Sequence, residues 1–242
     1  MTTETPAVAM LYPGHAAEDD FARAESLFGG AARLPVVITD IDSDDHTVEA
    51  MRAVGSDVPL LDGARRAAVH CPDALMWSCT SGSFLYGWEG AHTQVQRVAE
   101  ATGLPVSSTS LAFVAACRDL DVTRVAVAAT YPAPVADGFT TFLSDAGIEV
   151  LANTANDIAT AGAAGLMDDA TVTSMIVAAD HPAAQAVLVP DTALHTIARL
   201  TELEGAVGKP VLAANQVTVW QGLRLAGVAV TDTEPALGTL FA

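Results

Sequence analysis

The feature that most constrains the fold is an internal repeat of an apolar strand followed by a small polar loop. Residues 73–78 run into Cys79-Thr80-Ser81-Gly82-Ser83, and residues 185–190 run into Asp191-Thr192. The two segments align without a gap at a spacing of 112 residues, so that Cys79 matches Asp191. An apolar run that ends in small polar residues is typical of a buried strand opening into a loop at its carboxyl end. The repeat therefore predicts two equivalent strand ends, one with a thiol and one with a carboxylate, facing one site.

Apolar strand patterns alternate with helical patterns along the whole chain. We expect strands at about 7–12, 34–39, 73–78, 104–108, 124–130, 148–151, 185–190 and 210–213. We expect helices at 88–102, 110–119, 134–146, 168–179, 192–204 and 217–226. Regular alternation of this kind predicts βαβ units and parallel sheets.

The fold class that we predict is α/β, with two similar Rossmann-like halves whose parallel sheets are related by a pseudo-twofold axis. Tyr12-Pro13 recurs as Tyr131-Pro132, 119 residues on, as two copies of one half require. We expect residues 1–120 and 225–242 to form the N-terminal half and residues 121–224 the C-terminal half. Ligands of open α/β sheets bind at the carboxyl ends of the strands, so the active site is expected in the cleft between the halves.

Composition excludes several classes of protein. With 51% hydrophobic residues in 242, the chain can build a large core, and disorder is excluded as a general description. The net charge is −18 and Lys209 is the single lysine, so a nucleic-acid partner and a membrane-surface partner are not expected. No apolar run approaches the roughly 18–20 residues that span a bilayer. Three cysteines, an odd number, favour a reducing compartment, and we expect a cytoplasmic protein.

Cys79 is the first candidate for chemistry. A thiol among Ser78, Thr80, Ser81 and Gly82 lies in a loop rich in N–H and hydroxyl donors near an expected helix start. Such surroundings should lower the pKa of the thiol and make it nucleophilic. Cys71 and Cys117 lack such neighbours and are expected to be inert packing residues.

Asp191 is the second candidate, and two interpretations remain open. Directly after a buried strand it could be the N-cap of a helix beginning near Thr192. In a dry cleft opposite Cys79 it could instead donate a proton near neutrality.

Other polar residues follow the strand ends. Tyr131 could hydrogen-bond a substrate carboxylate or could be packing, and the Gly14 backbone could approach a ligand closely. His15 is expected to be exposed. Asp40, Asp42, Asp44, Asp45 and His46 match no metal-loop spacing and are expected to form a solvated loop. We expect no metal and no cofactor, because no nucleotide or zinc motif is present.

Taken together, the motifs resemble the aspartate/glutamate racemase superfamily, and within it the branch of maleate cis-trans isomerases and arylmalonate decarboxylases. The resemblance covers nearly the whole chain. It rests on the YPG loop at 12–14, SCTSGSFLYG at 78–87, ATGLPVSSTS at 101–110, RVAVAATYPAPV at 124–135 and KPVLAANQVTVWQGLRLAG at 209–227. The resemblance implies cofactor-independent chemistry at a carbon next to a carboxylate, between two facing positions that are often both cysteine. Here those positions are Cys79 and Asp191.

The difference between Cys79 and Asp191 lets us order the activities that the resemblance implies. A racemase favours two comparable groups, whereas a thiol and a carboxylate differ by about 4–5 units in reference pKa. Cis-trans isomerisation of a maleate-like diacid needs a nucleophile and an acid, which Cys79 and Asp191 would supply, and we expect this reaction first. A racemase or decarboxylase of an α-substituted carboxylate or malonate is the alternative, and a non-catalytic carboxylate-binding protein is the third.

The resemblance also implies which residues hold the small carboxylate substrate. Tyr131 and the Pro13–Gly14 loop would bind one carboxylate, and the Thr80–Ser81 backbone with Asn215 would bind on the other side. Thr192, the repeat partner of Thr80, is expected at the same site. The superfamily often forms dimers, and the sequence is compatible with a homodimer.

Overall fold

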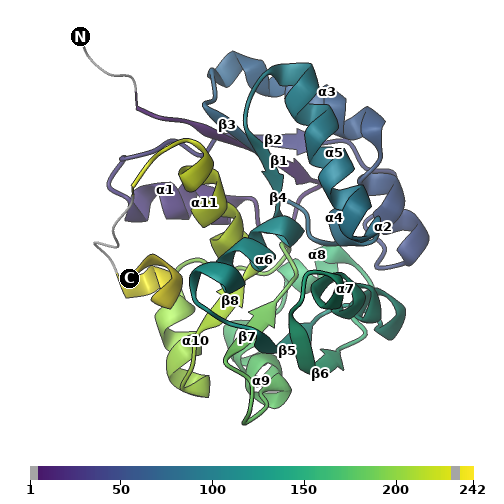
Figure 1. Ribbon diagram of the computed structural model, residues 1–242, viewed down its shortest axis with the longest axis vertical. Coiled ribbons are helices and arrows are strands. Elements are labelled where there is room, and N and C mark those ends of the chain that lie inside the picture. Colours follow the sequence, from purple (N-terminus) through teal and green to yellow (C-terminus); the bar gives the residue numbers. More distant parts are fainter. Residues whose placement is uncertain (1–4, 230–234) are drawn as a thin grey trace.

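The computed structural model describes residues 5–229 and 235–242, and it contains two four-stranded parallel sheets. The strand orders are β2-β1-β3-β4 and β6-β5-β7-β8, so the second sheet repeats the first. The strands are β1 (Val8–Pro13), β2 (Val36–Thr39), β3 (Ala74–Trp77), β4 (Val106–Ser108), β5 (Arg124–Ala129), β6 (Glu149–Ala155), β7 (Ala186–Val189) and β8 (Val211–Ala213). Figure 1 shows the first sheet in the upper part of the view and the second in the lower part. The predicted α/β fold with two similar halves is confirmed, whereas the predicted division of the chain at residues 120 and 225 stays a prediction.

All eight predicted strands are present within a few residues of their expected bounds. Every residue of β3 and of β7 is buried. Both strands are central in their sheets, with a strand on either side and helices over the faces, so a continuous apolar run is what each position requires.

The helices cover the sheets and fill the space between them. They are α1 (Asp19–Leu27), α2 (Val48–Val54), α3 (Asp57–Ala67), α4 (Ser81–Phe84), α5 (Gly87–Thr102), α6 (Thr109–Asp119), α7 (Ala133–Asp145), α8 (Ala161–Gly165), α9 (Asp169–Ala179), α10 (Leu200–Val207) and α11 (Ala214–Leu225). Helices α3 and α5 lie against the first sheet and α9 against the second. Helices α6 and α11 pack on each other between the sheets, where the hydroxyls of Thr109 and Thr218 are 2.6 Å apart.

Gly222 explains how closely α11 approaches the first sheet. A Cβ at this position would lie 2.7 Å from Cγ1 of Val8 and 2.9 Å from Cγ of Met76.

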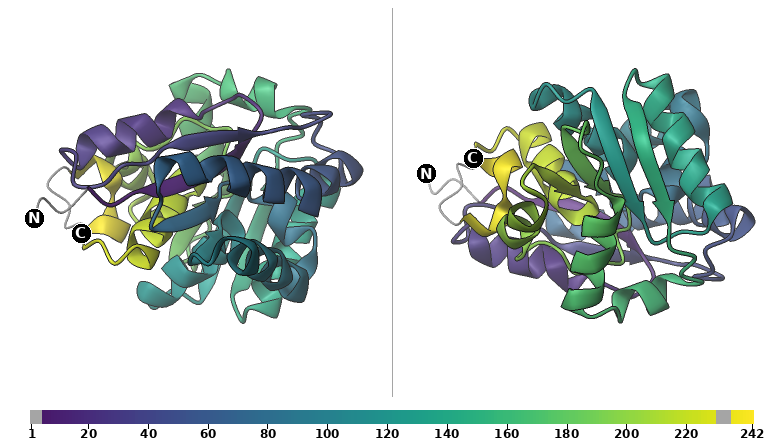
Figure 2. Two further views of the ribbon diagram at one scale, coloured as in Figure 1. Left: turned by 90° about the horizontal axis from the view of Figure 1, so that it is seen from above. Right: turned by 90° about the horizontal axis from the view of Figure 1, so that it is seen from below.

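The views in Figure 2 show the C-terminal segment beside α1, where the rings of Phe28 and Phe241 stack with their centroids 5.9 Å apart. The C-terminal residues thus complete the core around α1.

The predicted helix at 192–204 is wrong in its first half. Residues 191–199 form turns, and α10 begins only at Leu200. The backbone groups of this segment are bonded to side chains from distant parts of the chain, Tyr12, Asp20 and Asn215, rather than to a helix of their own. Tertiary contacts therefore override the local helical pattern.

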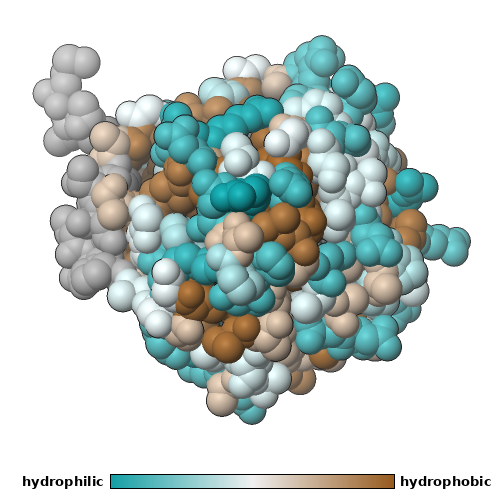
Figure 3. Space-filling view, turned by 60° about the horizontal axis from the view of Figure 1, so that its bottom comes forward, coloured by the Kyte–Doolittle hydropathy of each residue, from teal (hydrophilic) through white to brown (hydrophobic). Residues whose placement is uncertain are grey.

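The surface is polar and mixed. On the face shown in Figure 3, hydrophilic side chains are interspersed with apolar ones. Within residues 5–229 and 235–242, no helix combines the length and the apolar character that crossing a membrane demands.

Candidate active site

A pocket lies where the carboxyl ends of the central strands of both sheets meet. About 560 Å³ of atom-free space lies between its walls, a volume that includes open solvent at the mouth. Seven residues expected at the site line it: Pro13, Gly14, Cys79, Ser81, Tyr131, Asp191 and Thr192. Two strand ends that are 112 residues apart in the sequence therefore contribute to one space, as the repeat predicts for Cys79 and Asp191.

Cys79 follows β3 and has 5% of its surface exposed. Its Sγ accepts a hydrogen bond from the Gly82 N–H at 3.3 Å and lies 3.9 Å from the Ser81 hydroxyl. Burial nevertheless outweighs these donors and, with the nearby Asp191 carboxylate, raises the pKa of the thiol to about 11. The expectation of a lowered pKa is wrong, because the loop that supplies the donors also removes the thiol from water. Near neutrality Cys79 is a protonated thiol.

Asp191 follows β7 and Pro190 and is also 5% exposed. Its Oδ1 accepts from the Ala193 N–H at 2.9 Å, and its Oδ2 accepts a short hydrogen bond from the Thr130 hydroxyl. Both carboxyl oxygens of Asp191 therefore have a hydrogen-bond partner within the fold. Because no helix begins within eight residues of Asp191, the N-cap interpretation is wrong.

Two tyrosines hold the backbone on either side of Asp191. The Tyr131 hydroxyl donates to the carbonyl oxygen of Pro190 at 2.9 Å, and the Tyr12 hydroxyl donates to that of Thr192 at 3.0 Å. Burial raises the pKa of both phenols well above the usual value, so both stay neutral. Tyr12 lines the pocket although we did not predict it as a site residue. The repeat of Tyr12-Pro13 as Tyr131-Pro132 was the signal that could have identified it.

The loop after β1 forms another wall. Gly14 has a φ of +68°, and a Cβ there would lie 2.7 Å from Cδ1 of Ile41, so glycine lets the chain turn close to the neighbouring loop. His15 is at the rim, with 74% of its side chain exposed, and pairs with Glu18 at 3.0 Å. Its predicted exposure is confirmed.

Asn215 and Thr80 lie behind the pocket rather than among its lining residues. The Asn215 Nδ2 donates to the carbonyl oxygens of Thr192 and Leu194, at 3.2 and 3.3 Å, and to Oδ2 of Asp20 at 3.1 Å. Thr80 is fully buried, and its hydroxyl has no hydrogen-bond partner in the described part of the chain. Asn215 thus supports the residues next to Asp191 and does not itself face a ligand.

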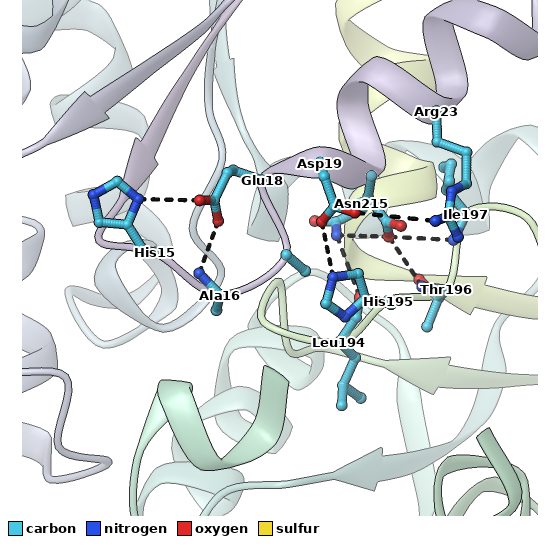
Figure 4. A network of polar contacts seen from close by, with 12 residues as sticks. His15, Ala16, Glu18, Asp19, Arg23, Leu194, His195, Thr196, Ile197 and Asn215 are labelled. Carbon is cyan, nitrogen blue, oxygen red and sulfur yellow. Dashed lines mark hydrogen bonds and ion pairs between the residues drawn. The ribbon is translucent and has the colours of Figure 1, made fainter. Parts of the chain in front are cut away.

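Asp20 is the second anchor of this loop. It is 1% exposed, and its Oδ2 accepts from the N–H groups of Thr196 at 2.9 Å and Ile197 at 3.2 Å. Figure 4 shows Asn215, Thr196 and Ile197 together beneath α1. Burial raises the pKa of Asp20 despite these donors. The sequence offered no signal for this role, because the partners are more than 170 residues from Asp20.

The acidic segment at 40–46 is partly different from its prediction. Its aspartates are exposed, as expected of a solvated loop, but His46 is only 4% exposed. Asp44, Asp45 and His46 all line the pocket. Across the residues that the structure describes, no group of three His, Cys, Asp or Glu side chains is arranged to hold a metal ion.

Similarity to known proteins agrees with this geometry. A sequence model of the family described as arylmalonate decarboxylase matches residues 47–241. The arylmalonate decarboxylase of Bordetella bronchiseptica is 30% identical over 212 residues, which is 86% of each chain. The chain belongs to the arylmalonate decarboxylase family. This family lies in the aspartate/glutamate racemase superfamily, so the predicted resemblance is confirmed.

Solved structures extend the likeness over the entire fold. A liganded variant of arylmalonate decarboxylase, in which one glycine is replaced by cysteine and one cysteine by serine, superposes with a TM-score of 0.86 at 29% identity, covering 98% of this chain and 99% of that one. An alanine variant of the maleate isomerase of Pseudomonas putida S16, solved with maleate, gives a TM-score of 0.87 at 19% identity, covering 98% and 97%. The second likeness concerns the fold alone.

Proposed function

We propose that this member of the arylmalonate decarboxylase family is a cofactor-independent decarboxylase of an α-substituted malonate, with Cys79 as the proton donor. The observation that carries the proposal is the buried thiol of Cys79 in the pocket lining, which is protonated near neutrality and shares that lining with the Asp191 carboxylate of the equivalent strand end. A decarboxylase of this kind needs one acid and no second base, which is what this unequal pair supplies.

In the proposed reaction, the bond between the α-carbon and one carboxylate breaks and CO₂ leaves. The electron pair stays on the substrate as an enediolate of the retained carboxylate. The Cys79 S–H then donates its proton to the α-carbon, and the resulting thiolate regains a proton from solvent. The Gly82 N–H, 3.3 Å from Sγ, stabilises the thiolate as it forms.

The part of the pocket wall that carries Asp191 would favour loss of CO₂. A substrate carboxylate placed against Asp191 meets a like charge in a buried place, and its departure relieves that repulsion. Gly14, Ser81, Tyr131 and Thr192 are proposed to surround the retained carboxylate. Thr80 and Asn215 would act from behind these residues, Asn215 by holding the Thr192 carbonyl.

Cis-trans isomerisation of a maleate-like diacid is the second candidate. The presence of a thiol and a carboxylate in one pocket favours it, since Cys79 could add to a double bond and Asp191 could exchange a proton with the adduct. It ranks second because addition needs a thiolate, whereas burial keeps the Cys79 thiol protonated.

Proton NMR in D₂O separates these functions. The protein is incubated in parallel with phenylmalonate and with maleate, alongside the variants Cys79→Ala and Cys117→Ala. Cys117 is the matched control, because it is a buried free thiol that is not among the residues lining the pocket. Phenylacetate carrying one α-deuterium, formed by the parent and Cys117→Ala but not by Cys79→Ala, supports the decarboxylase. Fumarate with the same dependence supports the isomerase. Binding without either product would overturn both and favour a carboxylate-binding protein.

A further inference from the structure

The pocket lining carries an excess of negative charge, which is unfavourable if the ligand is a carboxylate. Asp44, Asp45 and Asp191 line it, and no lysine or arginine is among its lining residues. A malonate brings two further negative charges to this space. Repulsion between like charges is weakly screened in a partly buried cleft, so an opposing positive charge would strengthen binding.

His46 is a buried candidate for that charge. It is 4% exposed and packs edge-on against Tyr131, with ring centroids 5.2 Å apart and planes at 80°. Its backbone N–H donates to the Ala159 carbonyl at 2.8 Å, and its ring Nδ1 lies 2.8 Å from the carbonyl oxygen of Ile158. The loop of the first half is thereby fastened to the second half, with the imidazole at the pocket wall.

The contact with Ile158 determines which ring nitrogen of His46 carries a proton. A carbonyl oxygen only accepts, so Nδ1 must carry hydrogen. The other nitrogen, Nε2, then has a lone pair when the ring is neutral and an N–H when it is charged. Nε2 has no hydrogen-bond partner within the described residues, and His46 is among the residues that line the pocket. It is therefore free for a ligand.

We infer that His46 is a ligand-binding residue whose Nε2, protonated as imidazolium, pairs with one carboxylate of the bound acid. The inference rests on the proposed function only in that the ligand is an anionic carboxylate. Binding would take up about one proton per site at a pH where the free imidazole is neutral. Because only the protonated ring carries this charge, binding would be stronger at lower pH than at higher pH.

Other titratable groups line the same pocket or lie near His46 in the chain or in space. Asp44 and Asp45 precede His46 on its loop, Asp157 precedes the segment that accepts from its ring, and Tyr131 packs on it. Cys79, Asp191 and His15 line the pocket with it. Of these, His15 is the other side chain that can carry a positive charge, but it is largely exposed and already paired with Glu18. The experiment must separate His46 from this set.

The test uses a background in which turnover is blocked. In Cys79→Ser, phenylmalonate binding is measured by calorimetry from pH 5.5 to 8.5, in two buffers of different ionisation enthalpy. His46→Asn is compared because its amide nitrogen can keep the Nδ1 contact with Ile158 while Nε2 is removed. His15→Asn is the control for a pocket histidine that is exposed.

We expect His46→Asn to weaken binding at least tenfold at pH 6, to flatten the pH profile and to abolish the proton uptake, whereas His15→Asn changes affinity less than threefold. His46→Gln, which offers a neutral donor near Nε2, should recover part of the affinity at pH 8 without the proton uptake. An unchanged affinity and proton uptake in His46→Asn would overturn the inference and leave His46 as a loop anchor. Since binding is measured without turnover, this outcome is independent of whether the parent decarboxylates phenylmalonate.

Discussion

The two strand ends that meet at the pocket occupy the same place in their sheets, yet they are built differently. Around Cys79 the hydrogen-bond partners are local, since Ser81 and Gly82 lie two and three residues away. Around Asp191 only Ala193 is local, and Thr130 is 61 residues away. The hydrogen-bond partners of the thiol therefore come from one short sequence motif, whereas most of those around the carboxylate are brought together by the fold.

Both tyrosines of the repeat donate hydrogen bonds to the backbone next to Asp191. Tyr12 and Tyr131 hold the carbonyls next to Asp191, although one of them comes from each half. Asp20 and Asn215 add donors and acceptors beneath the same loop. This asymmetry agrees with the proposed function, in which the carboxylate and the thiol have different roles.

The largest expected effect comes from moving the thiol. Cys79→Ala should lower kcat on methylphenylmalonate by on the order of 10³-fold, because the proton donor is lost. Adding Asp191→Cys should restore part of that activity and invert the configuration of the 2-phenylpropionate product, because the proton then arrives from the opposite strand end. Chiral chromatography of the product measures this. The same enantiomer from the parent and the double variant would show that the two ends do not address opposite faces.

A smaller loss is expected for Asp191→Asn. The amide can still accept from the Ala193 N–H, so the loop is kept while the negative charge is removed. Under the decarboxylase proposal, kcat should fall about tenfold, roughly the 1.4 kcal/mol attributed to repulsion in the ground state. Steady-state rates by CO₂ release measure this, with Thr130→Val as a control that removes one hydrogen bond and leaves the charge. A rate equal to that of the parent would assign Asp191 a purely structural role.

The hydrogen bonds of Asp20 to the 191–199 segment predict that substituting Asp20 destabilises the protein more than substituting its neighbour Asp19. Asp20→Ala leaves the N–H groups of Thr196 and Ile197 and the Asn215 amide without their acceptor, so the free energy of unfolding should fall by about 1–3 kcal/mol. Asp19→Ala removes a half-exposed partner of His195 and should change it by no more than about 1 kcal/mol. Urea denaturation of the two variants tests this. Equal losses would mean that Asp20 does not hold the loop.

The same contrast explains what the sequence could predict. The eight strands follow from continuous apolar runs such as residues 125–129, and the meeting of Cys79 with Asp191 follows from the repeat. The turns at 191–199 did not follow, since their partners on α1 and α11 lie far away in the sequence. His46 was missed for the same reason, because the carbonyl of Ile158 that orients it is 112 residues away.

The raised pKa of Cys79 was missed for a different reason. The donors in its loop are visible in the sequence, but the burial that outweighs them depends on how the two halves close around the loop. Local motifs therefore predicted which groups would meet, and the fold determined the protonation of the thiol.

The smallest expected effects concern alkaline pH. The rate of Cys79 alkylation by iodoacetamide should be slow near pH 7 and should rise about tenfold per pH unit toward a midpoint near 11, because only the thiolate reacts. Asp191→Asn should move that midpoint downward, since the carboxylate helps to raise the pKa of the thiol. Mass spectrometry of the Cys79 peptide measures both, and an unchanged midpoint would mean that the two groups do not interact.

The same pKa shift predicts how stability depends on pH. A thiol whose pKa is higher in the folded than in the unfolded chain stabilises the fold fully below the unfolded value, about 8.5, and loses that contribution as the pH rises through the folded value. The pKa values of Cys79 and Cys117 are raised to about 11 and about 12, so the free energy of unfolding should decline above pH 9. Cys117→Ala should make this decline shallower without altering the alkylation midpoint of Cys79, because Cys117 does not line the pocket. Urea denaturation at pH 8, 9 and 10 measures the slope, and a slope as steep as that of the parent would show that Cys117 does not contribute to it.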